Sequence, residues 1–408
     1  MVQNKQKKHQ LQVGPDTVRM LDLGHPWVIA DRFTKAWPTV ASGSLADLVD
    51  KEGRFLGTAM IDPGARIVAR VLSWSPVQID ADFLAKRVRQ AVNGRHWLDM
   101  GETDAWRMVN AEADGLPGLT IDRYGDFALI QYFNPGWERH LEVVAKALQL
   151  VSGFTGVYVK YRPQETRKLA AGKSEGRPMG RLIAGKAAPR ELIVKEHGLR
   201  YSVDLVRDLH TGLFPDQREN RLRLRAQAAG CALLNLFAYT AAFSVAAAAG
   251  GAKKVTSVDA SSRYLSQARR NFRLNDIDLA AHEFVEGDCF TELDRFKREG
   301  RIYDIVLIDP PSFSSTRRGR FTTGGGTAGL VAKSLGVLAS GGLLITSSNL
   351  QKMALADYLK ELRKGSLAAG RSLQIIEVGG QAPDFPFLPT FPEGQYLKYV
   401  VSVVKEKF

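Results

Sequence analysis

The chain has 408 residues, too many for a single hydrophobic core, and an apolar content of 45% that is ordinary for a globular protein. It has no apolar run as long as a membrane span, its basic start lacks the apolar core of a signal peptide, and its two cysteines cannot form a disulfide framework or a metal cluster. We therefore expect two or three domains, a cytoplasmic location, no membrane association and no metal site. Lys and Arg outnumber Asp and Glu by 56 to 43, which suits a polyanionic partner, above all a nucleic acid.

Short apolar runs separated by turn residues fill the N-terminal part of the chain. Residues 1–12 are polar and basic, and we expect a disordered tail there. A small β-barrel over residues 13–78 accounts for the pattern that follows. Its strands are expected at residues 18–21, 45–50, 54–61 and 66–74.

The pattern over residues 79–191 predicts a compact α+β domain. Apolar residues recur at helical spacing over 80–98 and 139–150, and strands are expected on both sides of the turn at 124–126 and over 156–160. The end of this domain, residues 161–190, is rich in glycine, lysine and arginine. It fits a solvated loop and an RNA-facing strip that binds phosphates equally well.

From residue 192 onward, apolar strands alternate with helices. This alternation predicts right-handed crossovers and a parallel sheet, completed by a strand over 395–404. The fold class is thus α/β, with a Rossmann-like domain over residues 192–408. The strands are expected at 233–237, 254–259, 283–288, 305–309 and 342–346, and the helices at 243–249, 262–275, 289–299, 329–338 and 354–369.

Three of these strands end in an acid, namely Asp259, Asp288 and Asp309. Ligands of open α/β sheets bind beyond the carboxyl ends of the strands, so Asp259 is suited to ribose hydroxyls and Asp288 to an adenine amine. Each Asp is also a candidate helix N-cap, but three at successive strand ends favour a nucleoside site. The first loop, residues 235–244, lacks the Gly-x-Gly-x-x-Gly that a pyrophosphate needs, which argues against an NAD oxidoreductase.

The sequence Asp-Pro-Pro-Ser-Phe at 309–313 resembles the fourth motif of class I S-adenosylmethionine (SAM) methyltransferases that act on nucleic-acid bases. Two prolines fix a stiff turn, the side chain of Asp309 or the carbonyl of Pro310 can accept a hydrogen bond from a base edge, and Phe313 offers a stacking face. The alternative is a strand that ends in a proline-rich turn with a buried phenylalanine.

The whole chain resembles the RlmI (YccW) family of class I methyltransferases of large-subunit (23S) ribosomal RNA. The resemblance is carried by residues 25–28, 112–125, 211–221, 234–240, 258–259, 309–313 and 392–398. It implies a PUA-like RNA-binding domain, an α+β middle domain and a methyltransferase domain, with SAM as cofactor and ribosomal RNA as partner; a homodimer is a further expectation. The residues implied in the SAM site are Gln217, Asn235, Phe237, Tyr239, Thr240, Asp259, Asp288 and Asp309.

Two positions depart from the family. Ala241 stands where the family usually has glycine; its Cβ narrows the room beside the methionine part of SAM and disfavours a positive φ, and SAM binding is expected to survive if φ is negative there. Cytosine-C5 members carry a cysteine after the fifth strand that adds to C6 of the base. Its place is taken here by Asn349, or by Ser348 with a shift of one residue, while Cys231 and Cys289 are expected to be small core residues.

Residues 347–352 resemble instead the corresponding stretch of a related guanine-N7 ribosomal RNA methyltransferase domain. A base nitrogen carries its own lone pair and needs orientation rather than a nucleophile, so Asn349 would orient a flipped-out base. The methylated atom stays open, since the family favours cytosine C5 and the residues favour nitrogen. Residues 316–327 are expected to form a basic lid over the substrate or, alternatively, a disordered loop.

The sequence therefore predicts a SAM-dependent methyltransferase of a base in large-subunit ribosomal RNA. Its expected catalytic residues are Asp309, Pro310, Phe313 and Asn349. Two alternatives stay open: a non-catalytic RNA-binding factor of ribosome assembly that retains the fold, and a methyltransferase of small molecules.

Overall fold

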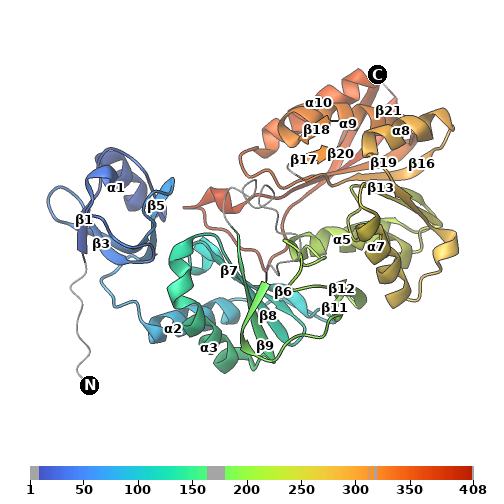
Figure 1. Ribbon diagram of the computed structural model, residues 1–408. Coiled ribbons are helices and arrows are strands. Elements are labelled where there is room, and N and C mark those ends of the chain that lie inside the picture. The colour runs from blue at the N-terminus through green and yellow to red at the C-terminus, as the bar shows by residue number, and fades with distance from the viewer. Residues whose placement is uncertain (1–8, 163–179, 312, 317–318, 407–408) are drawn as a thin grey trace.

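The computed structural model describes residues 9–162, 180–311, 313–316 and 319–406, with side chains described outside 312–325. Figure 1 shows an N-terminal domain, a middle domain and a C-terminal domain grouped around a common centre. In the described residues no helix is both long and apolar enough to cross a membrane, and no group of three or more His, Cys, Asp or Glu residues is arranged to hold a metal ion.

The N-terminal domain is built on a five-stranded sheet of order β1-β3-β4-β5-β2. Its elements are β1 (His9–Gln12), α1 (Pro15–Asp22), β2 (Trp27–Ile29), η1 (Thr34–Ala36), β3 (Leu45–Val49), β4 (Phe55–Ile61) and β5 (Ile67–Ser73). Two expectations were wrong. Residues 9–12 are not a tail, because they pair in parallel with β3 and bury Leu11. Residues 18–21 belong to α1, which begins with a proline in its first turn and buries Thr17 and Leu21, four residues apart.

The middle domain contains a five-stranded sheet of order β10-β9-β8-β7-β6, and α2 and α3 pack against it through one apolar core. Its elements are α2 (Ala81–Asn93), β6 (Ala105–Asn110), η2 (Ala111–Asp114), β7 (Leu119–Tyr124), β8 (Phe127–Tyr132), η3 (Pro135–His140), α3 (Leu141–Ser152), β9 (Gly156–Tyr161) and β10 (Gly180–Gly185). The sequence had indicated neither β6 nor β10, and β10 occupies residues 180–185 of the expected basic loop. Residues 163–179 of that loop lie outside the described part.

The C-terminal domain is a seven-stranded sheet of order β15-β14-β13-β16-β19-β21-β20. Its first five strands are parallel, as expected, whereas β21 runs antiparallel to both of its neighbours. The strands are β13 (Ala232–Leu236), β14 (Lys254–Asp259), β15 (Glu283–Glu286), β16 (Tyr303–Ile308), β19 (Leu338–Ser348), β20 (Arg371–Gly379) and β21 (Lys398–Glu406). The edge strand β20 was missed in the sequence.

Helices cover both faces of this sheet, so its central strands are buried on both sides. The helices are α5 (Arg218–Gln227), α6 (Ala242–Ala249), α7 (Ser262–Leu274), α8 (Cys289–Arg298), α9 (Thr323–Leu335) and α10 (Leu355–Ala368), with short turns at η4 (Pro215–Gln217), η5 (Leu279–Ala281) and η6 (Pro392–Gly394). Two hairpins were also missed: β11 (Leu192–Glu196) with β12 (Leu199–Val203), and β17 (Phe313–Thr316) with β18 (Gly319–Thr322). The second hairpin occupies part of the expected lid.

The connection between β20 and β21, residues 380–397, leaves the sheet and lies against both of the other domains (Figure 1). Its Asp384 accepts a hydrogen bond from the backbone N–H of Arg107 in the middle domain at 2.7 Å. Its Phe391 contacts Trp27 of the N-terminal domain with ring centroids 4.7 Å apart. This connection therefore joins all three domains.

Candidate active site between the three domains

Asp259 lies at the carboxyl end of β14, as expected, and fastens the first loop of the sheet to the second strand. Its carboxylate accepts the backbone N–H of Tyr239 at 2.8 Å and that of Ser261 at 2.9 Å. Burial raises the pKa of Asp259, and these two hydrogen bonds oppose the shift. The carboxylate thus shapes the loop beside which a nucleoside would bind.

Asp288 follows β15 by two residues and is the N-cap of α8. Its Oδ1 accepts the backbone N–H of Thr291 at 3.1 Å. The capping role that the sequence left open is therefore present. The side chain is half-buried at the same edge of the sheet as Asp259, and its contact with adenine stays a prediction.

Three residues of the first loop adopt the left-handed backbone conformation although none is glycine. The φ angles are 59° at Phe237, 52° at Tyr239 and 61° at Ala241. The negative φ under which SAM binding was expected to survive is therefore not the conformation of Ala241. Each such residue carries a cost on the order of 1 kcal/mol, and conformations of this kind persist where the surrounding contacts impose them. Here the fully buried Ala241 precedes the first turn of α6, and the N–H of Phe237 donates to Sγ of Cys289 at 3.3 Å.

The side chains of Asn235 and Thr240 are buried and hydrogen-bonded within the protein. The Asn235 amide donates to Oγ of Ser244 at 2.9 Å, and the Thr240 hydroxyl donates to the carbonyl of Gly212 at 2.6 Å. Both contacts hold the first loop in place, so in this structure these side chains support the loop. A direct contact of either side chain with the cofactor remains a prediction.

Asp309 comes directly after β16, where Pro310 and Pro311 end the strand. The side-chain amide of Gln217 lies 3.3 Å from Oδ2 of Asp309 and donates to Oγ of Ser347 at 2.8 Å. Burial raises the pKa of Asp309 to about 6, and the hydrogen bond from Ser347 opposes this shift. A nearby sulfonium would favour the ionised carboxylate, so the site fits the positive charge of SAM.

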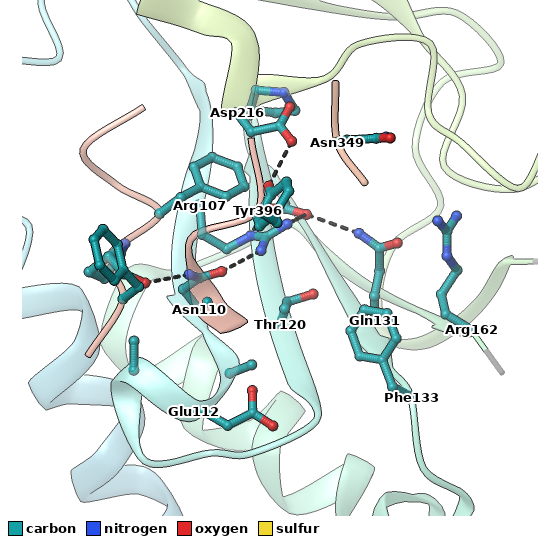
Figure 2. Close-up of a pocket in the computed structure, with 18 of the residues that line it drawn as sticks. Arg107, Asn110, Glu112, Thr120, Gln131, Phe133, Arg162, Asp216, Asn349 and Tyr396 are labelled. Carbon is teal, nitrogen blue, oxygen red and sulfur yellow. Dashed lines mark hydrogen bonds and ion pairs between the residues drawn. The ribbon is translucent and has the colours of Figure 1, made fainter. Parts of the chain in front are cut away.

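Next to this edge lies a cavity of about 490 Å³ whose walls come from all three domains (Figure 2). Asp216, the residue before Gln217, lines this cavity. Asn349, one residue after the end of β19, lines it as well. Many of its lining side chains are aromatic or charged. They include Trp27, Arg107, Glu112, Thr120, Gln131, Phe133, Arg162, His210, Phe214, Asp216, Asn349, Phe385, Phe387, Glu393 and Tyr396.

Hydrogen bonds of Tyr396 and Arg107 fix the charged side of the cavity, and the dashed lines of Figure 2 show those with Asp216 and Asn110. Tyr396 donates its hydroxyl to Oδ2 of Asp216 at 2.7 Å. Arg107 donates to both oxygens of Asp122, at 2.5 and 3.2 Å, and also to the side-chain carbonyl of Asn110. The guanidinium of Arg107 is therefore committed to its partners within the wall.

Asp384 connects Arg107, in the wall of the cavity, with α5 by hydrogen bonds. The carboxylate is fully buried and accepts two hydrogen bonds from Arg218 of α5, at 2.7 and 3.1 Å, besides the N–H of Arg107. On the other side, Trp27 donates its indole N–H to Oε1 of Glu112 at 2.8 Å. The cavity thus depends on polar contacts between domains.

Of the expected catalytic residues, Asn349 lines the cavity, whereas Asp309 does not belong to its described lining and Pro310 is buried next to Asp309. Ser348 is fully buried and its Oγ accepts the N–H of Leu350 at 3.3 Å, so Asn349 is the one that faces the cavity. The side chain of Phe313 lies outside the described part.

Neither cysteine belongs to the described residues that line the cavity. Cys289 is buried under the first loop, and burial raises the pKa of its thiol. Cys231 is half-buried just before β13, at the opposite end of the strand from the site. The expectation that neither thiol is placed to attack a base agrees with these positions.

Sequence reasoning did not bring together the residues of the cavity that come from outside the sheet edge, notably Trp27, Arg107, Asp216 and Tyr396. Three of these lie in stretches that carry the family resemblance, around 25–28, 211–221 and 392–398. The family resemblance of these three distant stretches could have indicated that they form one site, because residues that act together can be far apart in the sequence.

Two family models match the chain: an S-adenosylmethionine-dependent methyltransferase over residues 179–393 and a PUA-like domain over residues 11–74. Ribosomal RNA large subunit methyltransferase I of Escherichia coli O157:H7 is 34% identical over 377 residues, covering 92% of this chain and 94% of the relative. The protein of that name from Klebsiella pneumoniae strain 342 is 34% identical over 380 residues, covering 92% and 93%.

Among solved structures, a methyltransferase in complex with SAH superposes with a TM-score of 0.87 at 29% identity, covering 97% of this chain and all of that one. A SAM-dependent methyltransferase from Streptococcus mutans gives a TM-score of 0.84 with the same identity and coverage. The chain thus belongs to the S-adenosylmethionine-dependent methyltransferases, in the family of ribosomal RNA large subunit methyltransferase I.

Proposed function

We propose that this enzyme methylates a base of large-subunit ribosomal RNA and that the target nucleotide enters the cavity between the three domains. The cavity carries the proposal. Its volume of about 490 Å³ lies within the range of small-ligand sites, and its aromatic walls suit a base that has left its helix. Asp216 in its wall directly precedes Gln217, which contacts Asp309 at the cofactor edge.

The cofactor half of the site would hold SAM along the edge formed by the ends of β13, β14, β15 and β16. SAM supplies the methyl group on a positively charged sulfonium. Asp259 is placed for the ribose hydroxyls, Asp288 for adenine, and the carboxylate of Asp309 for the positive charge. The aromatic side chains of Phe237 and Tyr239 border this edge, where Tyr239 also packs against Tyr264 with ring centroids 4.5 Å apart.

We infer that the methyl group goes to a base nitrogen. Attack on cytosine C5 needs a thiolate that adds to C6, and the described residues of the cavity wall include an amide, Asn349, and no thiol. A nitrogen target needs its lone pair oriented toward the methyl group, which Asn349 and Asp309 can do by hydrogen bonding. Pro310 and Phe313 remain proposed contacts of the base on the strength of their motif.

The RNA-binding surface would extend from the cavity to the PUA-like domain. The net charge of +13 favours a polyanion. Arg162 lines the cavity, donates to the carbonyl of Leu209 at 2.5 Å, and forms no ion pair among the described residues. It is therefore available to a phosphate of the target nucleotide. A ribosomal RNA substrate would place the protein in the cytoplasm.

A homodimer is a further proposal, supported by the edge strand β20. Ile375, Ile376 and Val378 of this strand are about half exposed, and its unpaired edge resembles a template for pairing with another strand. Light scattering after size-exclusion chromatography measures the mass directly. A monomer at micromolar concentration would contradict the dimer, and replacing Ile376 by lysine should dissociate one.

Nucleoside mass spectrometry tests the proposed function. Large-subunit ribosomal RNA lacking its modifications, naked or in an assembly intermediate, is incubated with the protein and isotopically labelled SAM and then digested. Label in a nitrogen-methylated nucleoside is the expected result, and Asp309→Asn serves as the inactive control. Label in 5-methylcytidine would contradict the nitrogen target. Absence of label from both RNA forms would contradict the proposed function, and absence of SAM binding as well would favour a non-catalytic assembly factor.

A further inference from the structure

Asp216 is a carboxylate in the cavity wall that uses only one of its two oxygens. Oδ2 accepts the hydroxyl of Tyr396, whereas Oδ1 is buried and has no hydrogen-bond partner among the described residues. An unpaired buried acceptor costs about 1 to 3 kcal/mol, and more if it is charged, so such atoms are rare in folded proteins. A ligand that donates a hydrogen bond to Asp216 would recover this cost.

The cations nearest to Asp216 already have partners of their own. Arg107 is paired with Asp122, and Arg221 donates to both oxygens of Glu196 at 2.6 Å. Burial raises the pKa of Asp216, and these two arginines lower it only from a distance. The carboxylate is thus left without a donor of its own besides Tyr396, although Asp216 lines the cavity.

Two other oxygens of the cavity lining also lack a hydrogen-bond partner among the described residues. They are Thr120 Oγ1 and Glu393 Oε2, and both are buried. Oxygens of these kinds accept hydrogen bonds, and only the threonine hydroxyl can also donate one. The cavity therefore favours a ligand that brings donors.

The four RNA bases differ in what they can donate. Cytosine, adenine and guanine each carry an exocyclic amino group, whereas uracil has carbonyl oxygens in those places. A carboxylate attracts the amino group and repels the carbonyl. The χ2 torsion of an aspartate is broad, so a partial rotation of the carboxylate of Asp216, which lines the cavity, can turn Oδ1 toward a ligand while Oδ2 stays near Tyr396.

We infer that Asp216 accepts a hydrogen bond from the exocyclic amino group of the target base and so selects cytosine, adenine or guanine against uracil. This inference rests on the proposed function, because it takes the cavity to be the receptor of the target base. It adds a specificity residue that belongs neither to the cofactor edge nor to the Asp-Pro-Pro-Ser-Phe motif.

The test compares two synthetic RNAs that differ only at the base found to be methylated. One keeps the amino base, and the other carries its carbonyl counterpart: uridine for cytidine, inosine for adenosine or xanthosine for guanosine. Binding is measured by fluorescence anisotropy with S-adenosylhomocysteine present, so no reaction interferes. The wild-type protein is expected to bind the amino RNA about 10- to 100-fold more tightly, the usual range for one hydrogen bond to a charged group.

Asp216→Asn should erase or reverse this preference, because an asparagine amide donates to a carbonyl as readily as it accepts from an amino group. A merely destabilised protein would lose affinity for both RNAs alike. Asp357→Asn is the matched control, since it makes the same exchange at an exposed carboxylate outside the cavity lining; it should keep the preference for the amino RNA.

Equal binding of the two RNAs by the wild type would overturn the inference, and so would an unchanged preference in Asp216→Asn. Both results are distinct from a failure of the proposed function, in which unmodified ribosomal RNA receives no labelled methyl group from the wild-type protein. In that case no target base exists and the inference falls with it.

Discussion

The two halves of the site are built in different ways. The cofactor half lies along one edge of one sheet and is shaped by short-range hydrogen bonds such as that from the Tyr239 N–H to Asp259. The half that we assign to the base is enclosed by three domains and rests on hydrogen bonds between them, for example those of Asp384 with the N–H of Arg107 and of Trp27 with Glu112. The first half is therefore a property of a single domain, whereas the second exists only when the domains are docked.

This difference predicts that the base half can be damaged while SAM still binds. The largest effect should follow from Asp384→Asn, which weakens a buried carboxylate that holds Arg218 and the N–H of Arg107. We expect the free energy of unfolding to fall by about 3 to 5 kcal/mol, measured by urea denaturation, because a buried ion pair loses one partner.

The control for this substitution is Asp357→Asn, which removes an exposed pair with Lys360 and should cost less than about 0.5 kcal/mol. Methyl transfer to RNA should fall further than SAM affinity in Asp384→Asn. A stability within about 1 kcal/mol of the wild type would show that the domains do not depend on this contact.

A smaller effect of the same kind is expected for Trp27→Phe. The substitution keeps the ring beside Phe391 but removes the hydrogen bond to the half-buried Glu112. We expect kcat/KM for RNA to fall about tenfold, equivalent to about 1.4 kcal/mol, with SAM affinity unchanged in calorimetry. Trp97→Phe, at a side chain that is 65% exposed, is the control without effect. Equal losses in RNA and SAM binding would argue against the separation of the two halves.

The cofactor half should instead respond to pH. Asp309, whose pKa is raised to about 6, is neutral below that value and negative above it, so SAM affinity should rise from pH 5 to pH 7.5 by up to about tenfold. Without SAM the sign is opposite: ionising the buried carboxylate costs more in the folded than in the unfolded chain, so its contribution to stability is lost as the pH rises through about 6. Calorimetry on the wild type and Asp309→Asn checks this, and a pH-dependent affinity in the variant would assign the effect to another group.

The smallest effect concerns the strained loop. Ala241→Gly relieves a φ of 61°, worth about 1 to 2 kcal/mol, but gives up a buried methyl group worth about 0.8 kcal/mol. A net gain of about 0.5 kcal/mol is expected, seen as a slightly higher Tm. Ala248→Gly, within α6, should lower stability by about 1 kcal/mol. A loss of stability in both variants would mean that the buried methyl group of Ala241 contributes more free energy than the strained φ costs.

The same contrast explains what the sequence could reveal. Buried parallel strands leave long apolar runs, and an acid at the end of each run marks the edge of the sheet, so β14, β16 and their acids were readable. The cavity was not, because no local pattern tells that Trp27, Arg107 and Tyr396 meet. The predictions also failed for elements whose apolar residues show only weak periodicity. Four residues of α1 look like a strand, and the exposed edge strand β20 has apolar residues on both faces.

The connection between β20 and β21 has a consequence for synthesis. Arg107 and Asp384 are separated by 277 residues, and Arg95 reaches the backbone of Asp384 across 289. The N-terminal and middle domains leave the ribosome long before residues 380–397 do. Contacts between residues so far apart in the sequence form late in folding. A chain that is released early, even with its first six sheet strands complete, would lack the wall that residues 385–396 give to the cavity that we propose for the base.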